Sequence, residues 1–261
     1  MGKIRILKPL VILPGWIEGE PRKDYIEKVK LNFKENYERF LDPDTEVIHK
    51  EVPDAIGPHV EQYHESDLAG VAFAREALRG EGEGYDAIYI GCFAEPGMRA
   101  ARELCDTLVM SKPCAALHVA SMLGDKFSII ICGSGHIRTR LRDIVKRYGL
   151  ESRLASIRTL DVPPTGMNLS LLSQEGREEM QEKALEEARR AIEEDGAEVI
   201  IAYAGSYKHL KENLSVPVIN ANAAALKITE ALVKMGLTHS KRTYPKPRIT
   251  HKYYLNREAT K

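Results

Sequence analysis

The sequence predicts an α/β protein with two pseudo-symmetric domains, each built on a four-stranded parallel sheet flanked by helices. Short apolar segments alternate with amphipathic helical stretches from one end of the chain to the other, which is typical of parallel α/β proteins. Strand–turn–helix units of the first part also return, in the same order, in the second part. At 261 residues the chain is long enough for one large domain or two small ones, and this repetition favours two.

The first four predicted strands are short apolar segments. They are Lys8–Leu13, Thr45–Val52, Tyr85–Gly91 and Thr107–Met110. No apolar segment is long enough to span a bilayer, and the N-terminal one runs directly into a strand–turn pattern. We therefore interpret the N-terminal segment as a strand and not as a signal peptide, and we expect a cytoplasmic protein.

The next four predicted strands have the same character. They are Phe127–Cys132, Leu154–Leu160, Ala197–Tyr203 and Val216–Ile219. Helical patterns fill the gaps between the strands, with a long one over residues 173–195 and a short one over residues 206–214.

An internal duplication explains two sets of four strands. Residues 107–118 align with residues 216–227 without a gap, and each segment reads as a four-residue strand followed by an Ala-rich helix start. Ser111 and Asn220 stand at equivalent positions as N-cap residues of those helices. Both segments follow a strand–turn–helix unit, so the two halves agree in order and spacing.

The duplication also predicts the domain boundaries and the place of the ligand. The first domain comprises residues 1–110 together with the C-terminal helix and tail at 220–261, and the second comprises residues 111–219. Ligands of open parallel sheets bind beyond the carboxyl ends of the strands, next to helix N-termini. If the halves are equivalent, those ends face each other, which predicts a ligand cleft between the domains.

The composition excludes several classes of partner. Hydrophobic residues make up 43% and charged residues 29% of the chain, as in ordinary globular proteins. Lys and Arg number 38 and Asp and Glu also number 38, so no net charge attracts nucleic acid or a membrane surface. The four cysteines lack the spacing of metal ligands, and without an export signal we expect reduced thiols and no metal site.

Cys92 is the principal candidate for catalysis. It directly follows an apolar strand and precedes a Pro-Gly turn that opens a helix. A thiol near unpaired main-chain N–H groups at a helix N-terminus has a lowered pKa, and its thiolate attacks a carbonyl or removes a proton from carbon. The same N–H groups could bind a substrate carboxylate and stabilise the charge of an enolate.

The alternative is that Cys92 is a small buried hydrophobic residue at a strand end, as free cysteines often are. For Cys105 and Cys114, which lie in helical patterns, and for Cys132, which ends a strand, we favour that structural interpretation.

A second candidate site is the loop of residues 132–138, which leads from a strand into a helix. Its main-chain N–H groups and the Ser134, Gly135 and His136 region could bind an anion, and a carboxylate is our preferred ligand. The loop is too short for a dinucleotide fingerprint or a P-loop.

Four segments together resemble the Asp/Glu/hydantoin racemase superfamily, closest to its hydantoin racemase branch. They are "IGCFAEPGMRAAREL", "AALHVASMLGDKFSIIICGS", "EEDGAEVIIAYAG" and "VPVINANAAALKITEALVKMGLTHSK". The resemblance covers most of residues 86–241 in the same order. It implies two pseudo-symmetric α/β domains, a homo-oligomer and chemistry without a cofactor. One cysteine from each half then faces opposite sides of a carbon next to a carboxyl or carbonyl group.

This resemblance implies catalytic positions at Cys92 and Tyr203. Cys92 matches the first cysteine of the family, whereas Tyr203 stands where the family pattern carries the second. The family's Asn-Pro-Asn-Thr loop after the first strand also reads Leu13-Pro14-Gly15-Trp16 here, which predicts a reshaped pocket. Trp16 has a rival role as an interface or core anchor. The predicted substrate-binding residues are Pro14, Gly15, Trp16, Phe93, Ala94, Lys112, Ser134, Gly135, His136, Gly205 and Ser206.

A tyrosine at the second position changes the expected chemistry. Its phenol donates a proton but is a poor base at neutral pH, so the pair favours proton transfer in one direction. Racemisation in both directions needs a depressed pKa at Tyr203 or another base, for which His136, Lys112 and His209 are candidates. Each has a structural alternative, since His136 could only cap its loop and the other two could be solvated; Tyr203 could equally fill space.

Three functions are consistent with these residues. The first is a cofactor-independent racemase or epimerase of an amino-acid derivative or hydantoin-like compound, with Cys92 as one acid/base. The second is a single-cysteine lyase or isomerase of the same superfamily, of the decarboxylase or maleate isomerase type. The third is a relative that binds a small carboxylate without turnover.

The C-terminal tail of residues 240–261 is basic, aromatic and interrupted by prolines. Three alternatives stay open for it, because it could cover the body of the protein, cover a neighbouring subunit, or be loose. Its charge does not indicate nucleic-acid binding.

Overall fold

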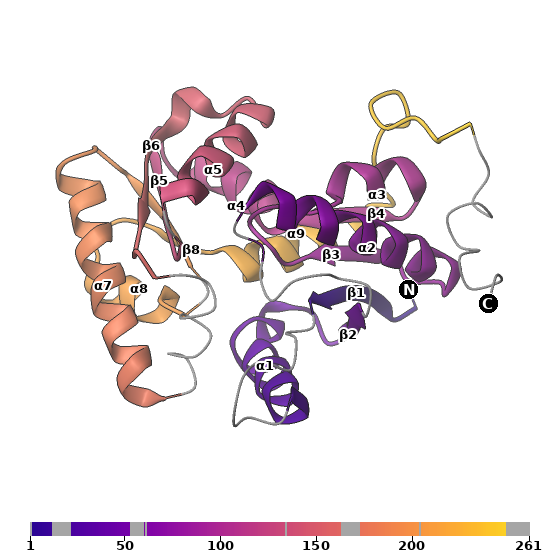
Figure 1. The fold of residues 1–261 in the computed structure, drawn as a ribbon, viewed down its shortest axis with the longest axis horizontal. Helices are drawn as coiled ribbons and strands as arrows, with labels where there is room; N and C mark the ends of the chain where they lie inside the picture. Colours follow the sequence, from indigo (N-terminus) through magenta and orange to yellow (C-terminus); the bar gives the residue numbers. More distant parts are fainter. Residues whose placement is uncertain are drawn as a thin grey trace. The chain divides into compact units, whose positions relative to one another are not determined.

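The computed structural model describes residues 2–11, 22–52, 60, 62–133, 135–162, 173–203 and 205–248. The chain divides into two compact units (Figure 1). Unit 1 takes its residues from Met1–Pro58, His64–Ser111 and Leu226–Lys261, and unit 2 takes them from His59–Tyr63 and Lys112–Ala225. Apart from the short segment His59–Tyr63, the chain therefore passes from unit 1 to unit 2 after Ser111 and returns within the last helix.

Unit 1 contains a four-stranded parallel sheet in the order β2-β1-β3-β4. Its strands are β1 (Ile4–Val11), β2 (Thr45–Val52), β3 (Ala87–Ile90) and β4 (Leu108–Ser111). Its helical elements are α1 (Arg22–Asn36), η1 (Glu38–Phe40), α2 (Tyr63–Gly82), α3 (Met98–Leu104) and the later part of α9 (Ala221–Lys234).

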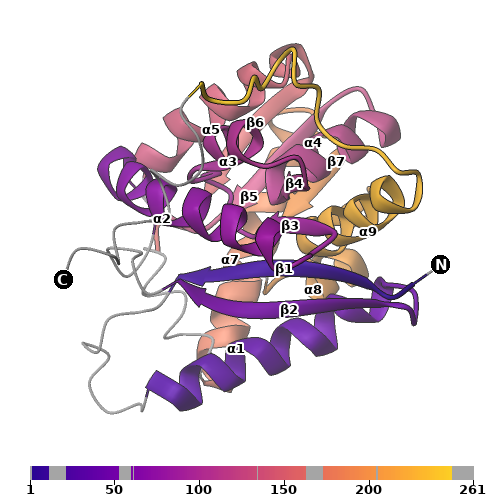
Figure 2. The same ribbon diagram turned by 90° about the vertical axis from the view of Figure 1, so that its right-hand side faces the viewer.

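The helices α1 and α2 cover opposite faces of this sheet. Leu7 and Lys8 are neighbours in β1, so their side chains point to opposite faces. The Lys8 ammonium lies 4.4 Å from the centroid of the Phe33 ring on α1, whereas Leu7 packs against Gly80 of α2. Figure 2 shows α1 running beside β2 and β1, with α2 across the strands from it. The strand β3 between these layers is completely buried.

Unit 2 repeats this architecture with a parallel sheet in the order β6-β5-β7-β8. Its strands are β5 (Phe127–Ile131), β6 (Leu154–Thr159), β7 (Val199–Ala202) and β8 (Val218–Asn220). Its helical elements are α4 (Lys112–Leu123), α5 (Gly135–Arg147), η2 (Glu151–Arg153), α7 (Gln174–Glu193), α8 (Tyr207–Asn213) and the first residues of α9. The two sheets have equivalent strand orders, which confirms the predicted fold class.

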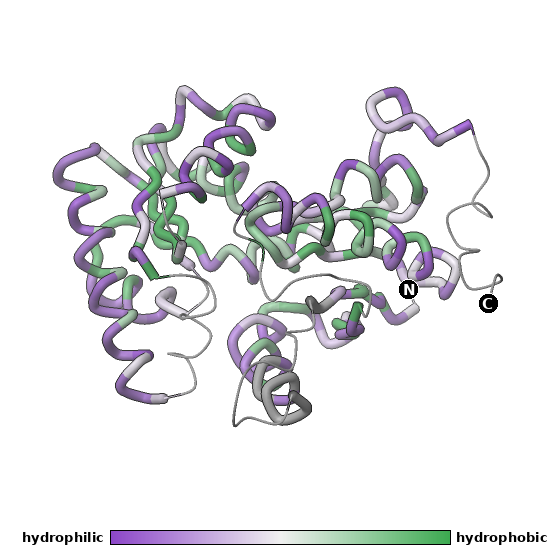
Figure 3. Tube along the Cα trace, viewed as in Figure 1, coloured by the Kyte–Doolittle hydropathy of each residue, from purple (hydrophilic) through white to green (hydrophobic). Residues whose placement is uncertain are grey.

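The long helix α7 shows how the sequence pattern produces this packing. Its N-cap is Ser173, whose Oγ accepts a hydrogen bond from the Gly176 N–H at 3.0 Å. Its buried residues recur at helical spacing and contact the sheet in a core cluster with Ile130 and Ile200; they are Met180, Ala184, Leu185, Ala188 and Ala191. Figure 3 shows the tube of α7 alternating between purple and green, as expected for a helix with one buried face.

Among the eight predicted strands only β2 has the predicted bounds, and the starts of β1 and β8 are two of the differences. β1 begins at Ile4 and not at Lys8. The predicted start is too late because Arg5 interrupts the apolar pattern, although it lies in the strand. The Arg5 guanidinium instead stacks 4.5 Å from the Tyr85 ring centroid. β8 begins at Val218, because Pro217 has no N–H group to donate to a sheet.

Residues 239–248 pack on unit 1, with His239 against the edge strand β4 and the described part of the C-terminal tail against helix α3 and the loop that follows it. His239 Nε2 lies 3.0 Å from the Val109 nitrogen and 2.7 Å from the Val109 oxygen. Arg102 of α3 donates to the Tyr244 hydroxyl at 3.0 Å. Of the three alternatives left open for the tail, residues 240–248 follow the first, which is to cover the body of the protein; residues 249–261 lie outside the described residues.

Among the described residues, no helix combines the length and the apolar character that crossing a bilayer requires.

Candidate active site

Cys92 begins a turn at the carboxyl end of β3. The chain leaves the sheet at Gly91, and Cys92 is half-buried. The Glu95 N–H donates to the Cys92 carbonyl at 3.3 Å, and the Met98 N–H donates to the Glu95 carbonyl at 3.3 Å. Two consecutive turns therefore connect Cys92 with helix α3. We call residues 92–97 the Cys92 turn.

The thiol of Cys92 does not lie directly at a helix N-terminus, contrary to the expectation from the sequence. Pro96 and Gly97 open helix α3 as predicted, with Gly97 as N-cap at φ +67°. However, the helix begins only at Met98, six residues after the cysteine. The N–H group that meets the sulfur comes from the turn itself, because the Ala94 N–H donates to Cys92 Sγ at 3.4 Å. This hydrogen bond stabilises a thiolate.

The side chains behind Cys92 come from β1 and β3. Lys8 is only 7% exposed, and its Cε would lie 3.2 Å from a Cβ at Gly91, so glycine leaves room for it. Tyr89 is fully buried; burial raises its pKa well above the usual value, and the neighbouring Tyr37 and Cys92 raise it further. A buried cation and a neutral phenol thus lie next to the strand end that carries the cysteine.

Phe93 and Ala94, two predicted substrate-binding residues, lie in the Cys92 turn. Their side chains are 8% and 7% exposed. They adjoin the cysteine in the chain, and their contact with a substrate stays a prediction.

Tyr203 directly follows β7 and starts a turn of the same kind. The Ser206 N–H donates to the Tyr203 carbonyl at 3.2 Å, as the Glu95 N–H does to the Cys92 carbonyl. Gly205 lies in this turn, and its carbonyl accepts from Gln181 Nε2 at 3.1 Å. The duplication therefore extends to the backbone of the two turns. The Tyr203 side chain is only 3% exposed and belongs to the apolar core cluster of unit 2, which favours a packing role.

The other predicted polar residues of unit 2 lie at helix starts or on the surface. Lys112 is the half-buried first residue of α4, and Gly135 and His136 are the exposed first residues of α5. His209 Nε2 pairs with Glu182 of α7 at 3.0 Å, which favours a structural role.

Four predicted substrate-binding residues, Pro14, Gly15, Trp16 and Ser134, lie outside the described residues.

Cys92 is less buried than two of the other cysteines. Cys105 is 1% exposed and Cys132 is 5% exposed, and burial raises the pKa of each thiol to about 12. Cys114 is half-buried within α4. A raised pKa disfavours the thiolate, so the structural interpretation of Cys105 and Cys132 agrees with their surroundings.

The family model for Asp/Glu/hydantoin racemases matches residues 32–229, which is most of the chain and includes both turns. The chain belongs to the Asp/Glu/hydantoin racemase family.

Relatives of this family member include hydantoin and allantoin racemases. It is 35% identical to the hydantoin racemase of Pseudomonas sp. (strain NS671) over 210 residues, which is 78% of this chain and 81% of that protein. It superimposes on the structure of the allantoin racemase from Klebsiella pneumoniae with a TM-score of 0.80 at 27% identity, over 97% of this chain and 99% of that chain. The protein is an isomerase of the racemase type.

A more distant structure shares only the fold with this family member. The crystal structure of arylmalonate decarboxylase matches with a TM-score of 0.58 at 13% identity, over 89% of this chain and 94% of that chain.

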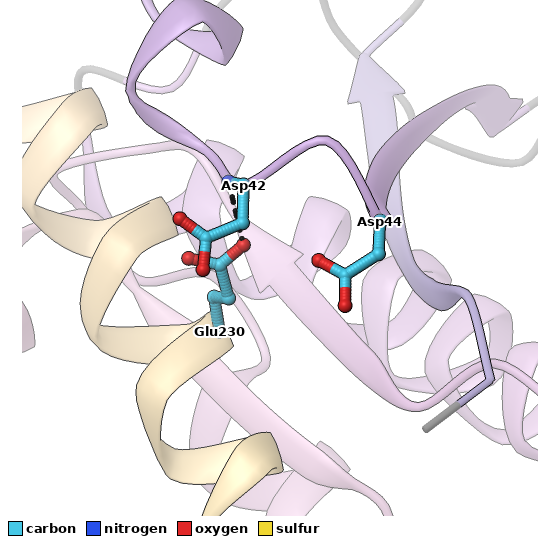
Figure 4. A group of neighbouring side chains, drawn as sticks. All are labelled: Asp42, Asp44 and Glu230. Carbon is cyan, nitrogen blue, oxygen red and sulfur yellow. Dashed lines mark hydrogen bonds between the residues drawn. The ribbon is translucent and has the colours of Figure 1, made fainter.

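One cluster of carboxylates in the racemase has the geometry of a metal site. Asp42, Asp44 and Glu230 each bring an oxygen within 4.8 Å of the others (Figure 4). The Lys227 ammonium already contacts Asp42 and Glu230, both at 2.5 Å, and the Lys234 ammonium contacts Asp42 at 2.7 Å. These cations hold the pKa of Asp42 down at about 2. The cluster therefore fits an ion-pair network that joins α9 to the start of β2, and not a metal ion.

The sequence analysis missed Glu95 and Ser111 as a pair. The Ser111 hydroxyl donates to the Glu95 carboxylate inside unit 1, and both side chains are buried. A charged residue within an otherwise apolar Cys92 turn was the available signal, but its partner lies 16 residues away on another strand.

Proposed function

We propose that this protein racemises hydantoin-like ring compounds at the carbon next to the ring carbonyl, with Cys92 as the acid/base group on one face. Hydantoin racemase and allantoin racemase among the relatives support this substrate class. A proton on a carbon beside a carbonyl is acidic because the carbanion is delocalised as an enolate. Such chemistry needs a positioned base and an acid, and the family resemblance implies no cofactor.

The observation that carries the proposal is the environment of the Cys92 sulfur. The sulfur lies beyond the carboxyl end of a central strand, where ligands of parallel sheets bind, and it accepts the Ala94 N–H at 3.4 Å. As a thiolate, Cys92 takes the proton, and the electron pair of the C–H bond moves to the carbonyl oxygen. As a thiol, it returns a proton to carbon and the enolate collapses to the carbonyl.

Racemisation also needs a proton donor on the opposite face, and Tyr203 is the proposed donor. A phenol gives up a proton to an enolate but recovers one slowly from a substrate at neutral pH. Conversion of one enantiomer should therefore be limited by Cys92 as base, and conversion of the other by Tyr203 as base.

A second candidate function uses Cys92 alone, as a stereospecific lyase or isomerase. The packing of the Tyr203 ring in the apolar core cluster favours it, since that role keeps the phenol away from substrate. The protein would then transfer a proton on one face only.

Solvent isotope exchange tests these functions. Single enantiomers of 5-substituted hydantoins and of allantoin are incubated with the enzyme in deuterium oxide, and products are read by NMR and chiral chromatography. Deuterium in both enantiomers supports racemisation. Deuterium in one product enantiomer supports the second candidate, and saturable binding without exchange indicates a protein that only binds its ligand.

Cys92→Ser is the decisive substitution. A serine hydroxyl is a far weaker acid than a thiol, so we expect turnover to fall by at least about 100-fold. Cys114→Ser is the matched control, because Cys114 is also half-buried and lies outside the Cys92 turn. Full activity of Cys92→Ser would remove the proposed mechanism.

A further inference from the structure

Glu95 is a buried carboxylate in the Cys92 turn. Its side chain is only 5% exposed, and the Ser111 hydroxyl, at 0% exposure, donates a hydrogen bond to it. Charged side chains are rarely buried without such partners, because an unpaired buried charge is costly. The hydrogen bond connects the Cys92 turn to the neighbouring strand β4.

The backbone of Glu95 is strained. Its φ of +50° lies in the left-handed region, which is unfavourable for a non-glycine residue. Such a conformation persists only where the surroundings enforce it. Here the Glu95 N–H donates to the Cys92 carbonyl, the Glu95 carbonyl accepts from the Met98 N–H, and the carboxylate is fixed by Ser111.

Ser111, which binds this carboxylate, has a fixed position in the sheet. It is the last residue of β4 and pairs in register with Ile90, the last residue of β3. It is also the last residue of unit 1 before the chain enters unit 2 at Lys112. Because two strand ends are fixed to each other there, the hydroxyl of Ser111 has little freedom to move.

We propose that Glu95 is a positioning residue for Cys92: its hydrogen bond with Ser111 holds the Cys92 turn in the shape in which the Ala94 N–H meets the cysteine sulfur. The inference rests on the proposed function of Cys92. Glu95 acts through the turn and not on the substrate, so its loss should change the reactivity of the thiol.

Glu95 can act on the thiol by its charge or through the shape of the turn, and the two effects have opposite signs. Among the described residues of unit 1, the other titratable groups beside the end of β3 include Lys8 of β1 and Tyr89 of β3, which itself neighbours Tyr37. A carboxylate acting only by its charge opposes ionisation of the thiol, so removing it would speed alkylation. A carboxylate acting through shape favours the thiolate, so removing it would slow alkylation.

The experiment measures the rate at which iodoacetamide alkylates Cys92 across the pH range, read by mass spectrometry on the peptide that contains it. For Glu95→Ala we expect the midpoint to rise by about one pH unit, which makes alkylation about tenfold slower at pH 7. Hydrogen exchange at the amides of the Cys92 turn should become faster in the same variant.

Three further variants are measured in the same alkylation experiment. Glu95→Gln keeps an oxygen that accepts from Ser111, so we expect its rate within about twofold of wild type. Ser111→Ala removes the same hydrogen bond from the other side and should slow alkylation in the same direction, which keeps the test available if Glu95→Ala does not fold. Glu103→Ala removes an exposed carboxylate from α3 and should leave the profile unchanged.

The inference is overturned if Glu95→Ala and Ser111→Ala both keep the wild-type profile, if Glu95→Gln is as slow as Glu95→Ala, or if loss of Glu95 speeds alkylation. These readouts do not require turnover. If the wild type exchanges no substrate proton but the profiles shift as expected, the proposed function fails and the positioning role stands. If the wild type racemises hydantoins and the profiles do not shift, only the positioning role fails.

Discussion

Gly97 and Gly70 bring the Cys92 turn into direct contact with helix α2. A Cβ at Gly97 would lie 2.1 Å from the Gly70 carbonyl oxygen, and a Cβ at Gly70 would lie 2.9 Å from the Gly97 nitrogen. The Gly97 φ of +67° also lies in the left-handed region. At residue scale, the candidate site therefore depends on two positions without side chains as much as on the cysteine.

Gly97→Ala should destabilise the protein by about 2–4 kcal/mol, since it adds both backbone strain and an overlap with α2. Gly149→Ala is the matched control, because Gly149 has a φ of +71° but nothing within 4 Å of an added Cβ. We expect that control to cost about 1 kcal/mol. Urea unfolding of both variants measures the difference, and equal losses would mean that the contact between the turn and α2 contributes nothing.

Edge strand β4 is covered in part by His239, which directly precedes the C-terminal tail. An exposed strand edge offers free main-chain groups for pairing with other chains. His239 lies against both main-chain groups of Val109, and Thr238 Oγ1 donates to the Asp106 carbonyl at 2.5 Å. At the scale of the element, two side chains that precede the tail therefore occupy main-chain groups at this edge of the sheet and just before it.

Because of His239, the stability of the protein should decrease when the pH is lowered. Burial, together with the charges of Arg102 and Lys241, lowers the pKa of His239 from 6.5 to about 4. The unfolded chain then binds a proton that the native state does not, so stability is lost as the pH falls from 6.5 toward 4. The shift sets an upper bound of about 3 kcal/mol, which solvent screening reduces to about 1–2 kcal/mol.

His239→Gln should remove this part of the pH dependence, because the amide still bonds to the strand but does not titrate. Urea unfolding of wild type and variant between pH 7 and pH 4 gives the difference directly. His64→Gln, at an exposed position of α2, is the control. A slope that is the same in all three proteins would contradict the role of His239.

At the scale of the whole molecule, the two units repeat one design. Both sheets are parallel with equivalent strand orders. Each is followed by a turn in which the N–H three residues further along donates to the carbonyl of Cys92 or Tyr203. The design diverges in the side chains, since Glu95 of the first turn is matched by Ser206 of the second. The repeat is therefore kept in the backbone of the two turns and not in their side chains.

Tyr203→Cys tests whether the repeat places residue 203 opposite Cys92. We expect racemisation to rise by at least about tenfold, because a thiol serves both as base and as acid near neutral pH. Tyr207→Cys, four residues further along in α8, is the matched control. No gain from Tyr203→Cys in a folded protein would favour the single-cysteine function.

Much of the fold was predictable because it depends on local patterns. The alternation of apolar strands with helical stretches predicts the parallel sheets, and the match of residues 107–118 with 216–227 predicts the repeat. β2 has the predicted boundaries, Thr45–Val52. The Asn220 side chain accepts from the Ala223 N–H at 3.1 Å, as an N-cap does. β1 was harder to delimit, because Arg5 interrupts its apolar pattern although the residue lies in the strand beside the Tyr85 ring.

The candidate site was predictable only as far as the strand ends. Cys92 could be singled out because a cysteine after a buried strand stands where ligands of parallel sheets bind. The source of its N–H partner could not, since Glu95 of the turn takes a positive φ and its hydrogen-bond partner Ser111 is distant in sequence.

The sequence by itself determined the two-fold α/β architecture, the family and the position of Cys92, because periodicity and short motifs are recorded residue by residue along the chain. Only the tertiary structure decided what surrounds the cysteine and the edge of its sheet. The Glu95–Ser111 hydrogen bond, the contact of Gly97 with Gly70 and the cover of β4 by His239 each join residues that are far apart along the chain. Such contacts form only when the packed elements bring those groups together, and no local pattern of the sequence specifies them.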